Sequence, residues 1–117
     1  MQRGPESIQT LRLLNALRKQ SKKGLVWKRV AYLIARPARK KAEVSLTKVS
    51  KFTKKDDVVI IPGKLLSSGI LTHSVKIACL RSSKAALVKT KAAGAKVITI
   101  AELMKENPSG SKTRILV

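Results

Sequence analysis

The stretch VKIACLRSSKAALVKTKAAGAKVIT, residues 75–99, carries the pattern that decides the fold class. Residues 75–80 and residues 96–99 are each expected to form a strand. Between these strands, Ser82 or Ser83 is expected to cap a helix that ends near Ala93, with Gly94 as its C-terminal stop. Strand, helix and strand in this order predict a βαβ unit. The helix has no clean apolar stripe, so its packing face is not predicted.

The flanking sequence continues the alternation of strands and helices. Upstream, the β-branched residues 58–61 predict a strand buried on both faces, and Pro62-Gly63 predicts a turn after it. Downstream, Thr99 and Glu102 have the spacing of a capping box, in which a hydroxyl and a carboxylate satisfy amides at the start of a helix. The sequence therefore predicts an α/β fold, a small mixed body of short strands and helices.

Two helices are expected near the N-terminus. The first follows a cap at Ser7 and ends near Lys19, and the second spans residues 25–35, since Pro37 disfavours helix at the residue before it. In the second helix the apolar residues share one side. The opposite, basic side carries Lys28, Arg29, Tyr32 and Arg36.

Three further segments link or follow these elements. Residues 36–41, RPARKK, form a basic segment in which an extended conformation is expected. A short helix capped by Ser45 comes next, with Leu46, Val49 and Phe52 pointing inward. The tail at 109–114 is polar and basic and is expected to be ordered only by a partner.

Charge is the strongest functional signal. The chain has 26 Lys and Arg against 6 Asp and Glu, a formal net charge of +20. This excess repels itself in a free protein, and a polyanion removes the repulsion. Between Arg12 and Lys41 there is no acidic residue. Nucleic acid is therefore the first candidate partner, ahead of an anionic membrane surface, because the basic residues extend along the whole chain.

Positive charge is denser before residue 57 than after it. We therefore expect residues 1–56 to form a basic, helical and extended RNA-binding extension. Residues 57–117 should form the compact α/β body with a short basic C-terminal tail.

Residues suited to catalysis are sparse. The single histidine, His73, is expected to be solvated or to contact phosphate, and the single cysteine, Cys79, to be a small buried hydrophobic residue. One His and one Cys disfavour a zinc site, and no cofactor is expected. The stretch around Lys64 is not a Walker phosphate loop, because the lysine directly follows the first glycine and Leu65 follows the lysine. It is either a plain turn or a bend that brings amides and Lys64 near an RNA phosphate.

Basic residues spread over every element suit a folded RNA, which is recognised by shape, backbone and 2′-hydroxyls. A reader of duplex DNA usually presents a recognition element with side chains for base edges. A DNA-compacting or gene-regulatory protein is the main alternative. An RNA-modifying enzyme is disfavoured by the single histidine and the few acids.

The stretch DVVIIPGKLLSSG, residues 57–69, resembles the archaeal ribosomal protein family L-eighteen-e, a relative of bacterial L-fifteen. Members carry a strand followed by a Pro-Gly-Lys-Val-Leu-Gly-x-Gly pattern, and the N-terminal helices, residues 43–46 and residues 98–108 also match. Ser67 stands where a glycine is common, and Ile70 stands where a glutamate is common, which would expose an apolar residue. The motif falls on Pro62, Gly63, Lys64 and Gly69.

The resemblance implies a structural constituent of the cytoplasmic large ribosomal subunit. Its expected partners are large-subunit ribosomal RNA and neighbouring ribosomal proteins, with no membrane and no small-molecule substrate. The family fold is an irregular strand-strand-helix superhelix, preceded by a basic helical and extended segment. Tyr32 is expected to stack on a base or ribose. The expected phosphate contacts are Lys28, Arg29, Arg36, Arg39, Lys40, Lys41, Lys64, Lys112 and Arg114.

Overall fold

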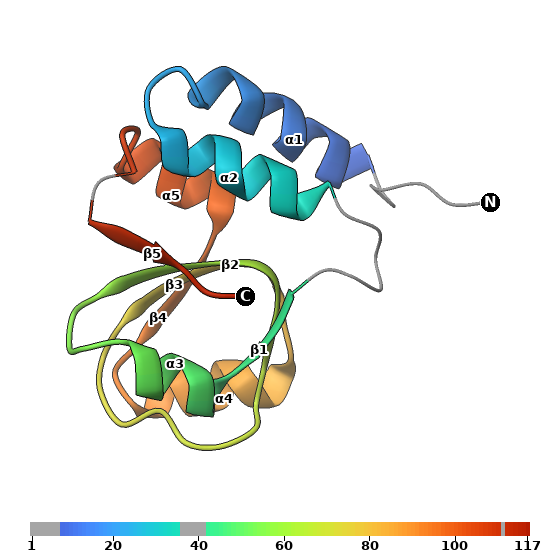
Figure 1. Ribbon diagram of the computed structural model, residues 1–117. Coiled ribbons are helices and arrows are strands. Elements are labelled where there is room, and N and C mark those ends of the chain that lie inside the picture. The colour runs from blue at the N-terminus through green and yellow to red at the C-terminus, as the bar shows by residue number, and fades with distance from the viewer. Residues whose placement is uncertain (1–7, 36–41, 111) are drawn as a thin grey trace.

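The computed structural model describes residues 8–35, 42–110 and 112–117 and has an α/β architecture, as the sequence predicts. A sheet of parallel strands lies between two layers of helices (Figure 1). The described elements are α1 (Ile8–Gln20), α2 (Leu25–Ile34), β1 (Ala42–Ser45), α3 (Leu46–Phe52), β2 (Val58–Leu66), β3 (Lys76–Ser82), α4 (Lys84–Ala92), β4 (Lys96–Thr99), α5 (Ile100–Glu106) and β5 (Thr113–Ile115).

The sheet has the strand order β1-β2-β3-β4, and every pair is parallel. Strands β3 and β4 with α4 between them form the predicted βαβ unit. The long strand β2 has two further partners, because residues 58–60 pair with β5 and residues 63–66 pair with β1. A strand that precedes β2 and the last strand of the chain therefore both pair with this central strand.

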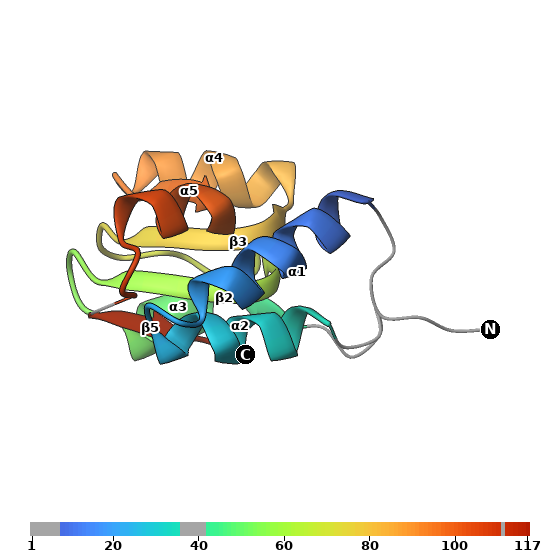
Figure 2. The same cartoon turned by 90° about the horizontal axis from the view of Figure 1, so that it is seen from above.

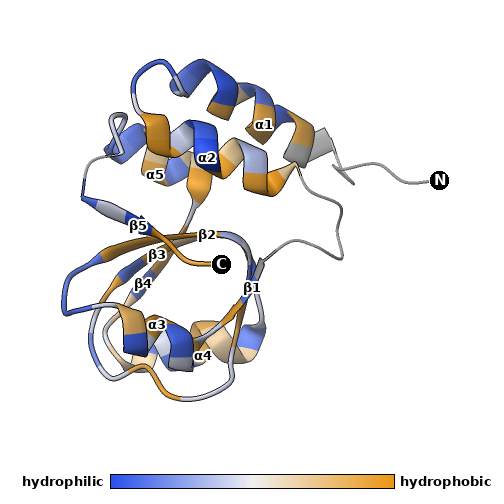
Figure 3. Cartoon of the chain, in the orientation of Figure 1, coloured by the Kyte–Doolittle hydropathy of each residue, from blue (hydrophilic) through white to orange (hydrophobic). Residues whose placement is uncertain are grey.

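Side-chain alternation along the strands divides the core into two clusters. Ile60 and Ala78 point to the face covered by α1, α2 and α5, which we call the α2 side. Their neighbours Ile61, Ile77 and Cys79 point to the face covered by α3 and α4, which we call the α4 side. Figure 2 shows α1 between α2 and α5, and Figure 3 shows hydrophobic colouring along much of β2. The predicted strand with both faces buried is confirmed.

Helix α2 packs as its periodicity predicts. Trp27, Val30 and Ile34 are fully buried, whereas the basic side of the helix is exposed. The indole Nε1 of Trp27 donates a hydrogen bond to the carbonyl of Pro108 at 2.7 Å, which ties the helix to the chain beyond α5. The expected cap at Ser7 and the basic segment 36–41 lie outside the described residues.

The predicted turn at Pro62-Gly63 is wrong, because both residues lie inside β2. Proline lacks an amide hydrogen and cannot donate to a neighbouring strand. In β2 it falls between the residues paired with β5 and those paired with β1, and the register with β3 shifts between Ile61 and Lys64. The strand therefore accommodates Pro62 by changing its pairing partner from β5 to β1 at this point, and it does not turn.

The tail was expected to be ordered only by a partner, and that prediction is wrong. Residues 113–115 form β5 and pair with β2 of the same chain. Gly110 is buried with a positive φ of 70°, and a Cβ there would overlap the side chain of Val26. The tail is ordered by close packing against α2 and by ladder hydrogen bonds, neither of which its polar composition indicates.

In helix α3, the predicted inward orientation is confirmed for two of three residues. Leu46 and Val49 are buried, but Phe52 is 49% exposed, so its inward orientation is wrong. Thr53 takes that place instead, buried and donating from Oγ1 to the Val49 carbonyl at 2.6 Å. On a helical wheel Thr53 falls between Leu46 and Val49, whereas Phe52 is displaced to one side.

The functional division at residue 56 stays a prediction. In the structure, α1 and α2 pack on the same sheet as the later elements. Strand β1, which also precedes residue 56, is a member of that sheet.

Candidate nucleic-acid interface

Positive charge on the described surface is almost entirely unpaired. All the described lysines and arginines are exposed except Lys48 and Lys76, which are partly buried. The described residues form two ion pairs, Lys76–Glu106 at 2.6 Å and Arg114–Asp57 at 3.8 Å. The first of these lowers the pKa of Glu106, mainly through the hydrogen bond from Lys76. Most of the basic groups are therefore available to an external anion.

The outer face of α2 brings together three of the predicted contact residues. Lys28, Arg29 and Tyr32 are all exposed, and Tyr32 is 61% exposed. The Arg29 guanidinium carbon lies 5.3 Å from the centre of the Tyr32 ring, a cation–π arrangement that holds the two side chains together. Neither α1 nor α2 contains an acidic residue, so nothing on these helices offsets the charge.

Lys64 lies on the central strand, β2. In the sheet it is the register partner of Glu43 on β1 and of Arg81 on β3, and all three side chains are exposed. The motif residues Pro62 and Gly63 are buried. Gly69 does bend the chain, with a φ of 85°.

The two predicted contact residues of the tail, Lys112 and Arg114, differ in their contacts within the protein. Arg114 donates weakly from Nη1 to the Phe52 carbonyl at 3.4 Å and lies beside Asp57, yet its side chain is 58% exposed. Lys112 is exposed and has a positive φ of 59°. The predicted contacts Arg36, Arg39, Lys40 and Lys41 lie outside the described residues.

The remaining candidate groups have structural roles. Both ring nitrogens of His73 lie within hydrogen-bond distance of threonine hydroxyls, Nε2 at 2.8 Å from Thr53 and Nδ1 at 3.1 Å from Thr72. Asp57 accepts from the Lys54 amide at 2.8 Å, in the turn just before β2. Cys79 is buried as predicted, and burial raises the pKa of its thiol to about 11.

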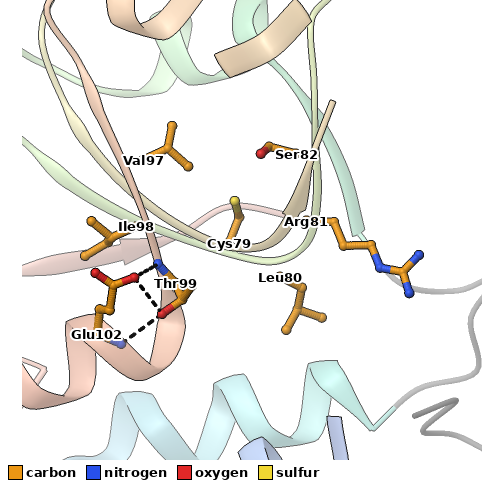
Figure 4. A pocket seen from close by; sticks show the side chains of 8 residues that line it. All are labelled: Cys79, Leu80, Arg81, Ser82, Val97, Ile98, Thr99 and Glu102. Atoms are coloured by element: carbon orange, nitrogen blue, oxygen red, sulfur yellow. Dashed lines mark hydrogen bonds between the residues drawn. The ribbon is translucent and has the colours of Figure 1, made fainter. Parts of the chain in front are cut away.

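A pocket lies at the carboxyl ends of β3 and β4 (Figure 4). Its acidic residue, Glu102, accepts hydrogen bonds from the backbone amide and the hydroxyl of Thr99, so it completes the predicted capping box of α5. Arg81 extends away from the other lining side chains in Figure 4. The pocket is thus a gap beside a helix cap.

Neither metal-binding clusters nor membrane spans occur in the described ranges. These ranges contain no group of three or more His, Cys, Asp or Glu residues placed to hold a metal ion. No helix within them combines the length and apolar character that a bilayer span requires.

Comparison with known proteins identifies the family. The chain is 46% identical over 92 residues to large ribosomal subunit protein eL18 of Archaeoglobus fulgidus, covering 79% of each chain. It is 42% identical to eL18 of Methanococcus maripaludis over 109 residues, which is 92% of this chain and 91% of the relative. The chain belongs to the eL18 family. A third eL18, from Methanopyrus kandleri, is 35% identical over 97% of this chain and 94% of its own. No family model matches the sequence.

The sequence predictions missed one group of exposed lysines in this eL18-family chain. Lys84, Lys89 and Lys91 on α4 are exposed on the α4 side of the sheet. A signal for them was present, because no acidic residue occurs between Asp57 and Glu102. This stretch without acids predicts unpaired positive charge in the same way as the N-terminal stretch that contains α2.

Proposed function

We propose that the chain is a structural constituent of the cytoplasmic large ribosomal subunit that binds and stabilises large-subunit ribosomal RNA through contacts with the phosphate backbone. Membership in the eL18 family supports the assembly, and the unpaired positive charge of the α2 face supports the mode of binding. Neighbouring ribosomal proteins are the other expected partners. The role is architectural and requires no chemical step.

The α2 face suits a phosphate backbone in chemical detail. Guanidinium groups form paired hydrogen bonds with phosphate oxygens, and ammonium groups act as mobile point charges. The exposed Tyr32 ring offers a stacking surface for a base or a ribose. Because Arg29 already lies over this ring, little conformational freedom should be lost when the pair meets RNA.

Binding to a polyanion should also stabilise the protein. At a formal net charge of +20, self-repulsion opposes the compact state, and a ligand that binds only the folded form shifts the equilibrium toward it. The free chain should therefore unfold more easily at low salt than at moderate salt. Bound ribosomal RNA should stabilise the folded chain even at low salt.

The experiment that tests this function is a salt titration of RNA binding. The variant Lys28→Gln/Arg29→Gln and the wild type are titrated against purified large-subunit ribosomal RNA at several salt concentrations. Each lost phosphate contact should lower the slope of log affinity against log salt by about 1, so we expect a fall of about 2. An unchanged affinity and slope would remove the α2 face from the interface.

A matched control corrects for net charge. Lys96→Gln/Lys105→Gln also removes two charges, one from β4 and one from α5, the helix that carries the acids Glu102 and Glu106. We expect this variant to retain most of the wild-type affinity and slope. An equal loss in both variants would mean that only overall charge matters.

Two further titrations address the remaining predictions. Replacing Arg36, Arg39, Lys40 and Lys41 with Ala tests the basic segment, which should lower affinity and slope more than the α2 variant does, because four charges are removed. Duplex DNA serves as the competing ligand. Equal affinity for duplex DNA and folded ribosomal RNA at physiological salt would favour the DNA-binding alternative.

A further inference from the structure

Helix α4 presents an unusual outer surface. Its buried residues are the small Ala86 and Thr90, one turn apart. The larger Leu87 and Val88 are 44% and 69% exposed. They lie on one stripe with Lys84 and Lys91, since positions i, i+3, i+4 and i+7 share a helix face. The outer stripe thus consists of two apolar side chains with a lysine at each end.

The adjoining loop, residues 67–70, directs its carbonyl groups toward the protein. Lys89 on α4 donates to the carbonyls of Ser67 at 2.8 Å and Gly69 at 3.1 Å. From α3, the Thr47 amide donates to the Ser68 carbonyl at 3.2 Å, and the Ser50 hydroxyl donates to the Ile70 carbonyl at 2.9 Å. The loop therefore joins α3 to α4 as one continuous surface.

The amides of the same loop remain available. Within the described part of the chain, no acceptor receives a hydrogen bond from the backbone N–H of Ser68, Gly69 or Ile70, and all three residues are exposed. These successive amides, beside a glycine with a φ of 85°, are available to an anion such as a phosphate oxygen. The Ile70 side chain beside it is 73% exposed, as the family comparison of the sequence led us to expect.

Charge on this surface has one sign. Neither α3, α4 nor the loop between β2 and β3 contains an acidic residue. Lys51, Lys84 and Lys91 are exposed, and the Lys51 ammonium lies 5.9 Å from the centre of the exposed Phe52 ring. Exposed apolar groups among lysines, with free amides between them, match the mixture of phosphate and ribose on an RNA backbone.

We propose that α3, residues 67–70 and α4 form a second RNA-binding surface, on the opposite side of the sheet from the α2 face. One molecule would then bridge two segments of ribosomal RNA across its sheet (Figure 1). This inference rests on the proposed function, because it presupposes that the α2 face also binds RNA. Charge complementarity favours RNA over a neighbouring protein, since a protein partner would have to supply several acids against these lysines.

Hydroxyl-radical footprinting of large-subunit ribosomal RNA tests the bridge. The wild type should protect two separate RNA segments. Lys28→Gln/Arg29→Gln should weaken one protection, and Lys84→Gln/Lys91→Gln should weaken the other. Neither the Lys84 nor the Lys91 side chain has a hydrogen-bond or ion-pair partner among the described residues, so both changes should leave the fold intact. Lys96→Gln/Lys105→Gln is the control with the same loss of charge and should keep both protections.

Different outcomes separate this proposal from the function on which it rests. If the α4 variant retains both protections at full strength while the α2 variant loses one, the second surface is disproved and the proposed function stands. If the wild type protects no RNA, the proposed function fails as well. Circular dichroism and urea unfolding confirm that each variant is folded.

A crosslinking experiment distinguishes RNA from a protein neighbour. Val88→Cys is labelled with a short photo-crosslinker and incorporated into large subunits. The natural Cys79 should not interfere, since it is buried and its pKa is raised to about 11. Crosslinks to ribosomal RNA would support the proposal, and crosslinks exclusively to a protein would overturn it.

Discussion

Helices α2 and α4 cover opposite sides of one sheet with side chains of very different size. Helix α2 buries Trp27, Val30 and Ile34 and exposes its charged side. Helix α4 buries Ala86 and Thr90 and leaves Leu87 and Val88 outside. Helix α2 therefore combines a buried anchoring face with a separate exposed face that we propose binds RNA. In helix α4, apolar groups remain on the surface where a partner can use them.

Loss of the largest anchor on the α2 side should have the greatest effect. Trp27→Ala removes a fully buried indole and its hydrogen bond to Pro108, and should lower the free energy of unfolding by about 3–5 kcal/mol. Urea denaturation measures the change. Tyr32→Ala, on the exposed face of the same helix, should stay within about 0.5 kcal/mol of wild type. A loss under about 1 kcal/mol for Trp27→Ala would contradict the assigned role of this anchor.

The loop on the α4 side should show the next largest effect. Gly69→Ala places a Cβ at a φ of 85° where it would overlap the Thr47 hydroxyl, so we expect a loss of about 2–3 kcal/mol. Gly94→Ala provides the control, because its φ is also positive, at 77°, but the nearest atom to the added Cβ is 4.0 Å away. It should cost about 1 kcal/mol. Equal losses in thermal or urea unfolding would show that the loop does not pack closely on α3.

Helix caps should contribute about equally on the two sides. Ser83 caps α4 by accepting from the Ala86 amide at 3.1 Å, and Thr99 caps α5 by accepting from the Glu102 amide at 3.1 Å. Replacing either with Ala should cost about 1 kcal/mol in the free energy of unfolding. Serine at position 99 is the conservative control and should retain most of that stability. A negligible loss for both Ala variants would mean that the caps are replaced by water.

The outer stripe of α4 should be nearly neutral for stability. Leu87→Ser/Val88→Ser changes two apolar side chains that are largely or partly exposed, and the free energy of unfolding should change by less than about 1 kcal/mol. The same variant should weaken the RNA protection assigned to the α4 side. A large loss of stability would show that these residues serve the core, and the contrast between the two helices would disappear.

How far the sequence predicts the structure follows from the same contrast. The large residues of α2 recur at helical spacing and leave one arrangement that buries them, so its two faces were predicted correctly. In α4 the buried residues are small and the exposed ones are apolar, so periodicity does not reveal the packing face. Hydrophobicity alone misplaces Phe52, because its angular position on the short helix α3 lies to one side of the buried residues Leu46 and Val49.

Long-range pairing explains the other errors. Pro62 is accommodated because β2 changes partners there, and both partners are distant in sequence. The tail residues 113–115 are ordered by β2 and by the contact of Gly110 with α2. No local sequence pattern in a polar tail predicts such a long-range contact. For the interface, acid-free runs predicted unpaired charge, but assigning it to two faces required the sheet topology.

The central claim is that the unpaired lysines and arginines lie against ribosomal RNA. An electron cryo-microscopy map of large subunits containing this chain tests it directly. We predict phosphate oxygens within hydrogen-bond reach of Lys28 and Arg29 on α2. A map in which these side chains face open solvent, with no RNA phosphate near either, would contradict the account.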